Sequence, residues 1–249
     1  HLSPVATVCC CFFTSKTHKE SFLLMKASTV SYSDCRIRNG KWWGHTPLSL
    51  PLIPGIDFVG KIDGIDKRTS SRSGLRNGDT VMSLVRHGGN ARYTQIGADQ
   101  LVKVPDDLEA VDVVCLAEAY LSAFQAVHSG QRLLTRYKQN SLLGKSVLVL
   151  GALTNTGRAV VELANAAGAT LIYAPCKAKH RERVRAMGTC PLGLSKVEWM
   201  PLLNKKLDLV IDTTIELSGK EENYFSALSE KGQYLFIGRT QNDVDKIIT

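Results

Sequence analysis

The spacing of hydrophobic residues changes near the middle of the chain. In the first hundred residues they form short strand-like runs, separated by Asn-Gly, Pro-Gly and Asp-Gly pairs that favour tight turns. This spacing predicts a small barrel or sandwich. The serine-, arginine- and glycine-rich residues 67–76 predict a mobile surface loop. The expected strands are residues 5–13, 21–30, 56–61, 80–84, 91–96 and 100–104.

After residue 105, helical periods alternate with short apolar strands. An acidic start at residues 106–109 leads into a buried helix that reaches residue 128, and a second helix is expected around residues 132–140. Such alternation predicts a parallel sheet with helical crossovers. The remaining elements are a strand at 147–150, a helix ending at Gly168, a strand at 170–174, a helix within 192–203, a strand at 207–213, a helix within 221–230 and a strand at 232–238.

The stretch around residue 150 carries the most specific chemistry. A short apolar strand runs into a glycine-bounded turn and then into a helix, an arrangement that can bring backbone N–H groups to a phosphate. A dinucleotide-binding turn has a further glycine in its middle, so an ordinary strand-to-helix turn also fits the pattern. The candidate cofactor-binding residues of this turn are Gly151, Ala152, Thr154, Asn155, Thr156 and Gly157.

A cationic segment follows the next expected strand. Sites that prefer NAD have an acidic residue there for the ribose hydroxyls, whereas this chain has Lys177 and Lys179 and no acid before Glu182. Positive charge at a helix N-terminus opposes the helix dipole, so a solvated helix start is the less consistent reading. The two lysines therefore predict recognition of the 2′-phosphate of NADPH.

Composition narrows the class of protein. The 249 residues are 44% hydrophobic and 22% charged, as in an ordinary globular chain. The net charge of +8 comes from scattered lysines and arginines with few aromatics, so we expect no nucleic-acid partner. Seven irregularly spaced cysteines favour reduced thiols. No apolar run reaches the length of a membrane span, so none is predicted.

Blocks of sequence in one consistent order resemble the medium-chain dehydrogenase/reductase superfamily, and most of all its zinc-free quinone oxidoreductase branch. The resemblance extends from about residue 21 to residue 238. It is carried by residues 28–34, 51–60, 77–81, 86–93, 101–105 and 119–126, together with the strand, turn and helix around residue 150.

The resemblance implies an α/β protein with two domains. Residues 1–122 would form a GroES-like β-barrel domain for the substrate, and residues 123–249 an incomplete, C-terminally truncated Rossmann domain that binds NADP. It also implies that Ser122, Thr213 and Gly238 line the cofactor site. Tyr32 and Asp34 are the implied catalytic candidates, for substrate polarisation or proton relay. A packed ring and a turn-capping carboxylate are the structural alternatives for these two residues.

Zinc chemistry is not expected. The positions that match the first zinc ligands of the wider superfamily look to be Ser31 and the pair Ile56-Asp57, and neither serine nor isoleucine is a credible ligand. Cys35 and His87 stand near these segments, where packing or hydrogen bonding is the simpler role. Trp42 and Trp43 could form an aromatic lip for a flat quinone, or could equally pack between domains.

The resulting hypothesis is a zinc-independent oxidoreductase that transfers hydride from NADPH to a quinone or an α,β-unsaturated carbonyl. The alternative is a degenerate, non-catalytic member of the fold that binds nucleotide or a protein partner. We expect a small-molecule substrate, no membrane partner, and a possible homodimer through the open edge at residues 232–237. We expect a cytoplasmic protein. The chain opens on His1 rather than on Met, so targeting to an organelle is kept as the alternative.

Overall fold

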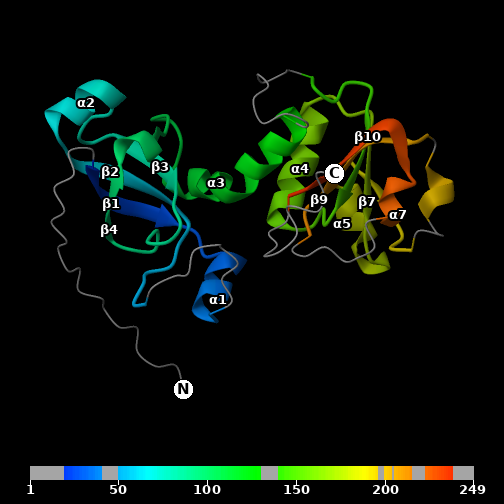
Figure 1. The fold of residues 1–249 in the computed structure, drawn as a ribbon, viewed down its shortest axis with the longest axis horizontal. Coiled ribbons are helices and arrows are strands. Elements are labelled where there is room, and N and C mark those ends of the chain that lie inside the picture. Colours follow the sequence, from blue (N-terminus) through cyan, green and yellow to red (C-terminus); the bar gives the residue numbers. More distant parts are fainter. Residues whose placement is uncertain are drawn as a thin grey trace. The chain divides into compact units, whose positions relative to one another are not determined.

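The structure is a computed structural model, and it describes residues 20–40, 50–129, 140–195, 199–203, 205–214 and 222–237. These residues divide into two compact units, one running to Ala117 and the other beginning at Glu118. The boundary falls inside helix α3 (Ala110–Phe124). Each unit has its own sheet and its own core (Figure 1). The expected strand at residues 5–13 and the body of the helix expected at 132–140 lie outside the described residues.

The first unit is built on a five-stranded antiparallel sheet in the order β4-β1-β2-β3-β5. Its main core joins side chains from β1, β2 and β3, among them Leu23, Phe58 and Val81, all of which are almost fully buried. The β-rich prediction for this part of the chain is confirmed. The strands are β1 (Glu20–Ser28), β2 (Asp57–Ile65), β3 (Thr80–Leu84), β4 (Tyr93–Gly97) and β5 (Val102–Lys103).

The prediction of a loop at residues 67–76 is wrong, because Lys67–Ser73 forms helix α2. The Asp66 carboxylate accepts hydrogen bonds from the backbone N–H groups of Arg68 and Thr69, each at 3.0 Å, which caps the helix start. Gly74, with φ at +74°, ends the helix in the left-handed conformation. Capping at both ends therefore outweighs a serine-rich composition. A 3₁₀ turn, η1 (Ala98–Gln100), precedes β5.

The second unit is built on a five-stranded parallel sheet in the order β10-β9-β6-β7-β8. The prediction of a parallel sheet with alternating helices is confirmed. The strands are β6 (Ser146–Leu150), β7 (Leu171–Pro175), β8 (Cys190–Leu192), β9 (Leu207–Asp212) and β10 (Leu228–Phe236). The helical segments are α4 (Asn155–Ala166), α5 (Arg181–Arg185), α7 (Glu222–Phe225), the 3₁₀ turns η3 (Ala178–His180) and η4 (Met200–Leu202), and the π-helical η2 (Gln125–Ser129) that continues α3.

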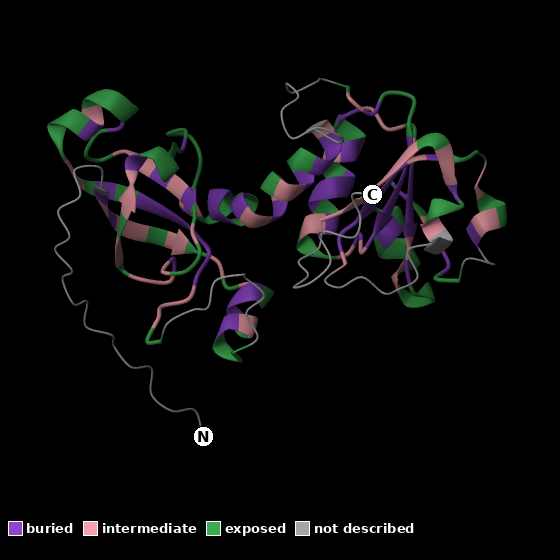
Figure 2. Ribbon diagram, viewed as in Figure 1, coloured by how far each residue is buried: buried purple, intermediate pink, exposed green. Residues whose placement is uncertain are grey.

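The central strand β6 is buried on both faces (Figure 2). Val147 and Val149 pack into a core that they share with α3 and α4. Leu148 and Leu150 point to the opposite face, into a core that contains Trp199. This arrangement explains why the strand reads as a continuous apolar run rather than as an alternating one.

The helix expected within residues 221–230 is shorter than its sequence pattern suggested. Within residues 221–230 only α7 is helical, because its last turn closes early and Leu228 already pairs with Leu207 in the sheet. Within residues 192–203, Leu192 is the last residue of β8 and pairs with Pro175, residues 196–198 lie outside the described residues, and Trp199 is helical and precedes η4. Gly168 follows α4 with φ at +84°, which confirms its expected place at a left-handed helix end.

One helix in the described part of the chain is long and apolar enough to cross a membrane by length and composition. It runs over Ala110–His128, with a mean hydropathy of 1.5. The helix itself was expected, as a buried helix that reaches residue 128, but its match to a membrane span was not, because Asp112 and Glu118 interrupt its apolar run. Of this helix 39% is buried: Val113 and Ala123 lie in the cores of the two units, whereas Leu116 and Leu121 are exposed.

Candidate functional site

The turn between β6 and α4 lies at the carboxyl end of the parallel sheet, where ligands bind in folds of this kind. Gly151 follows β6 directly and has φ at +76°, a conformation that favours glycine. A Cβ atom at Gly151 would also lie only 2.7 Å from the hydroxyl oxygen of Thr213. The side chain of Ala152 is buried in the core, so only its backbone faces the turn.

Gly157 lets the first turn of α4 pack directly against this loop. A Cβ atom at Gly157 would lie 2.1 Å from the carbonyl oxygen of Gly151 and 2.9 Å from the Cα of Ala152. Both neighbours are backbone, so neither can move aside. The sequence therefore needs glycine at both ends of the turn, and the close approach between helix and loop is the one that phosphate-binding turns require.

Thr154 caps α4. Its hydroxyl oxygen accepts a hydrogen bond from the Gly157 N–H at 2.9 Å and lies 3.0 Å from the hydroxyl oxygen of Thr213. Asn155 and Thr156 follow as the first two helical residues, and the Asn155 side chain is exposed. The N–H groups of Asn155 and Thr156 in the first helical turn have no partner within the helix, so they point outward as donors with a partial positive charge.

The end of β9 contributes a second polar group that the sequence reading did not single out. The buried Asp212 carboxylate accepts hydrogen bonds from the Thr214 N–H at 2.8 Å, the Thr214 hydroxyl at 2.6 Å and the Tyr234 hydroxyl at 2.5 Å. Thr213 is buried beside it, and its hydroxyl donates to the Leu150 carbonyl at 2.8 Å. Asp212 thus fixes the loop that carries Thr213. Its sequence signal was a carboxylate at the very end of an apolar strand.

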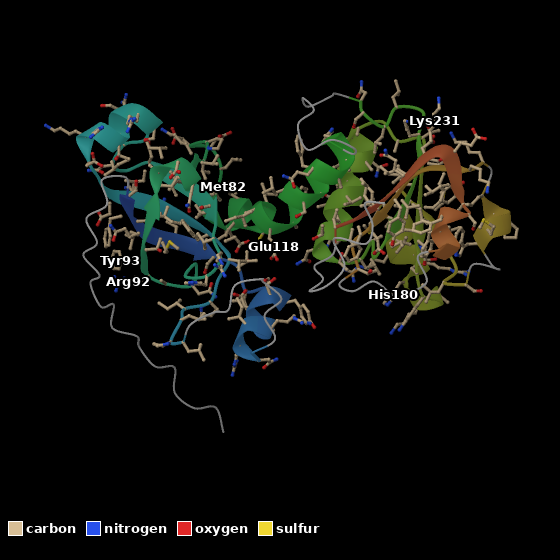
Figure 3. The ribbon with its side chains drawn as sticks, viewed as in Figure 1. Met82, Arg92, Tyr93, Glu118, His180 and Lys231 are labelled. Carbon is tan, nitrogen blue, oxygen red and sulfur yellow. The ribbon has the colours of Figure 1, made fainter. Side chains whose placement is uncertain are left out.

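The cationic segment after β7 is exposed at both of its predicted positions, Lys177 and Lys179. His180 of the same segment lies at the opposite end of the unit from Lys231 (Figure 3). Cys176, just before it, is buried, and burial raises the pKa of its thiol although the charge of Arg181 acts against this. The segment can therefore present positive charge beside the carboxyl end of the sheet.

The remaining cofactor candidates are less defined. Ser122 is half-buried on α3, in the same unit as the turn. Gly238 lies outside the described residues, as do Trp42 and Trp43. Within the second unit the structure brings together Gly151, Thr154, Gly157 and Thr213 through direct contacts.

In the first unit, the catalytic candidates Tyr32 and Asp34 belong to helix α1 (Tyr32–Arg38). The Tyr32 ring is 55% exposed. The buried Asp34 carboxylate completes a capping box, accepting from the Ser31 N–H at 2.7 Å, and its other oxygen accepts from the Gly55 N–H at 2.7 Å. These contacts make Asp34 a capping residue. A part in proton transfer stays a prediction for both residues.

A second buried carboxylate, Asp57, stands close to Asp34. It accepts a hydrogen bond from the Thr29 hydroxyl at 2.5 Å and a longer one from the Thr29 N–H at 3.3 Å. Burial raises the pKa of the Asp57 carboxyl, and the negative charge of Asp34 adds to this, against the lowering effect of the Thr29 hydrogen bonds. Folding therefore favours the protonated form of Asp57.

This shift predicts a pH-dependent effect of Asp57→Asn. Because the folded-state pKa lies above the unfolded one, the stability from Asp57 is fully present below the unfolded pKa and is lost as pH rises through the folded pKa. The uncharged asparagine side chain keeps an acceptor for Thr29 and avoids this loss. We expect the Tm of the variant to gain on that of the wild type as the pH rises above about 4, measured by differential scanning calorimetry.

Asp208→Asn serves as the control of opposite sign. Burial alone would raise the pKa of Asp208, but two hydrogen bonds from Ser146 and the charges of Lys145 and Lys205 outweigh it and lower the pKa. That stability is present above the unfolded pKa and is lost as pH falls through the folded one. This variant should therefore be less stable than the wild type at neutral pH, by a margin that closes in acid. A pH-independent Tm difference for Asp57→Asn would contradict the assignment.

The described residues contain no group of three His, Cys, Asp or Glu side chains that could hold a metal ion. Ser31, which the sequence resemblance matches to the first zinc ligand of the wider superfamily, caps α1. Cys35 and His87 are both exposed.

Comparisons with known proteins found similar sequences and similar folds. A family model described as the alcohol dehydrogenase GroES-like domain matches residues 18–111. The chloroplast envelope quinone oxidoreductase homolog of Arabidopsis thaliana is 29% identical over 178 residues, which are 68% of this chain and 50% of that protein. The 2-methylene-furan-3-one reductase of Solanum lycopersicum is 25% identical over 232 residues, 88% of this chain and 55% of that protein.

A solved structure of the same fold is the quinone oxidoreductase of Thermus thermophilus, which has also been determined with NADPH. Its TM-score is 0.67 at 24% identity, over 90% of this chain and 66% of that one. At this identity the likeness shows the fold. The chain spans about half the length of the curated relatives it matches first, with coverages of 50%, 41% and 55%.

Proposed function

Since the chain belongs to the medium-chain dehydrogenase/reductase superfamily, on its quinone oxidoreductase-like side, we propose that it is an NADPH-dependent reductase of quinones or α,β-unsaturated carbonyls. The observation that carries the proposal is the turn from Gly151 to Gly157, in which two glycines bring a helix N-terminus against a loop at the carboxyl end of a parallel sheet. A bulky side chain at either glycine would close this cradle.

The chain's own residues would hold the cofactor by its phosphates. The N–H groups of Asn155 and Thr156 point out of the first turn of α4 toward an anion. Lys177 and Lys179 supply the positive charge that a 2′-phosphate needs. Thr213, held in place by the Asp212 loop, fixes the floor of the turn. When bound, the nicotinamide would supply the hydride, and the protein would bind, orient and exclude water.

The curated relatives support the substrate class. The proteins matched include quinone oxidoreductases, a trans-enoyl reductase and a reductase of a methylene-furanone, and the names of the last two denote reduction of a conjugated C=C bond. For this chain we extend that to an electron-poor double bond or quinone ring. Tyr32, with its exposed ring, is the side chain that we propose as the polarising group on the substrate.

The first test is binding followed by turnover. We expect saturating NADPH to raise the Tm by several degrees and NADH to raise it less, because a ligand that binds only the folded state stabilises it. A simple quinone should then be reduced at the expense of NADPH, followed as loss of the dihydronicotinamide absorbance. Equal Tm shifts with both nucleotides would argue against the cofactor assignment. Binding without turnover would favour a non-catalytic nucleotide-binding protein.

A further inference from the structure

The hydroxyl groups of Thr154 and Thr213 form a relay of hydrogen bonds at the turn from Gly151 to Gly157 (the phosphate turn). The Thr213 hydroxyl lies 2.8 Å from the Leu150 carbonyl oxygen and 3.2 Å from the Gly151 carbonyl oxygen, neither of which can donate, so Thr213 is the donor. Its single hydrogen is thereby used. The hydrogen between the two threonines, whose oxygens lie 3.0 Å apart, must then come from Thr154.

The start of α4 belongs to the same relay. The Thr154 oxygen accepts the Gly157 N–H at 2.9 Å while its own hydrogen goes to Thr213. The relay therefore runs from the Gly157 N–H through Thr154 and Thr213 to the Leu150 carbonyl, and every hydroxyl in it both donates and accepts. It links residues 59 positions apart in sequence.

This relay changes what the turn can offer an anion. With glycine in place of Thr154, the Gly157 N–H would be open to a ligand. Here that donor is occupied, and the Thr154 hydroxyl has no hydrogen left to give. The donors that remain are the N–H groups of Asn155 and Thr156 and the exposed carboxamide of Asn155, which makes no hydrogen bond to another described residue.

We propose, on the basis of the proposed function, that Thr154 stands in for a phosphate oxygen at the helix start and that Asn155 is the side chain that meets the cofactor's pyrophosphate. Thr154 and Thr213 are then positioning residues, and Asn155 is the binding residue. The turn binds the pyrophosphate with one donor fewer than a glycine-centred turn, so the Thr154 hydroxyl lowers the affinity for NADPH.

Two glycine variants at adjacent positions test this with opposite expected signs. Thr154→Gly returns the Gly157 N–H to the ligand, and one added hydrogen bond to a charged group should tighten the Kd for NADPH about tenfold. Glycine is itself an acceptable helix cap, so the loss of stability should be small. Asn155→Gly removes the carboxamide donor and should weaken the Kd about fivefold. Titration calorimetry measures both.

Two controls isolate the turn. Thr154→Ser keeps the hydroxyl and should leave the Kd for NADPH within about twofold of the wild type. Adenosine 2′-monophosphate carries the 2′-phosphate but no pyrophosphate, so its Kd should be the same in the wild type and all three variants. A change in that Kd would indicate a general loss of the fold and would overturn the local interpretation.

The outcomes separate this inference from the proposed function. If the wild type binds NADPH and Thr154→Gly binds it more weakly, the Thr154 hydroxyl contacts the ligand and the inference is overturned while the function stands. An unchanged Kd in Asn155→Gly overturns the role of Asn155. If the wild type binds neither nucleotide, the proposed function fails. NADPH binding gained by Thr154→Gly would then still support the relay. The absence of NADPH binding in both the wild type and Thr154→Gly would overturn it.

Discussion

Replacing Gly157 with alanine should unfold the phosphate turn and abolish NADPH binding. The added Cβ would meet the Gly151 carbonyl oxygen at 2.1 Å, far inside van der Waals contact. Because the obstacle is backbone, the helix start or the loop must shift. We expect a loss of at least about 3 kcal/mol in unfolding free energy. Urea unfolding checks it, followed by the tryptophan emission, to which Trp199, buried in the same unit and stacked on Tyr224, contributes.

Gly144→Ala is the matched control within the same unit. Gly144 has φ at +76°, but a Cβ atom there would meet nothing within 4 Å. This variant therefore measures the cost of a left-handed alanine alone, about 1 kcal/mol, and should keep NADPH binding. Equal losses in the two variants would mean that the collision at Gly157 relaxes at little cost, and would contradict the requirement for glycine at this position.

Reversing the charge at Lys177 and Lys179 together should weaken the Kd for NADPH by about a hundredfold and leave the Kd for NADH within about twofold. The two lysines are exposed, so each pairs only weakly with anything in the free protein. Against a doubly charged phosphate, a charge-assisted hydrogen bond is lost and a repulsion gained. The measurement is fluorescence or calorimetric titration of the Lys177→Glu, Lys179→Glu variant with both nucleotides.

The control must change the net charge equally without touching the carboxyl end of the sheet. Lys145, which directly precedes β6, and Lys231, at the far end of the unit from His180 in Figure 3, are both exposed. Reversing both should leave the preference for NADPH intact. If it falls as far as in the Lys177 and Lys179 variant, the cationic segment acts only through the overall charge, and the 2′-phosphate assignment fails. Repeating both titrations at high salt separates screened from local contributions.

Much of the fold could be predicted from the spacing of hydrophobic residues in the sequence, whereas the contacts of the candidate site could not. The run from Val147 to Leu150 predicts a strand buried on two faces, and that is its position in the sheet. Helices α1 and α2 were not predicted, although the sequence contains the residues that cap them. Ser31 with Asp34 is a capping box, and Asp66 with Gly74 brackets α2.

Contacts between residues that are far apart in the sequence could not be predicted. Nothing local in the sequence places Thr213 within hydrogen-bonding distance of Thr154, because that contact exists only once β9 lies beside β6. The partnership of Asp212 with Tyr234 has the same origin in the pairing of β9 with β10. Glycine positions were predictable as requirements of a turn, while the reason for Gly157, a collision with Gly151, needed coordinates.

The double burial of β6 has a consequence for the order in which the molecule loosens. Its peptide hydrogens lie between two neighbouring strands and under two cores, so they should be the last to be replaced by deuterium from the solvent. The turn from Gly151 to Gly157 starts directly after this strand. The turn is therefore attached to the part of the chain that should exchange most slowly. The Leu150 amide should stay protected while the amides at the tip of the turn exchange.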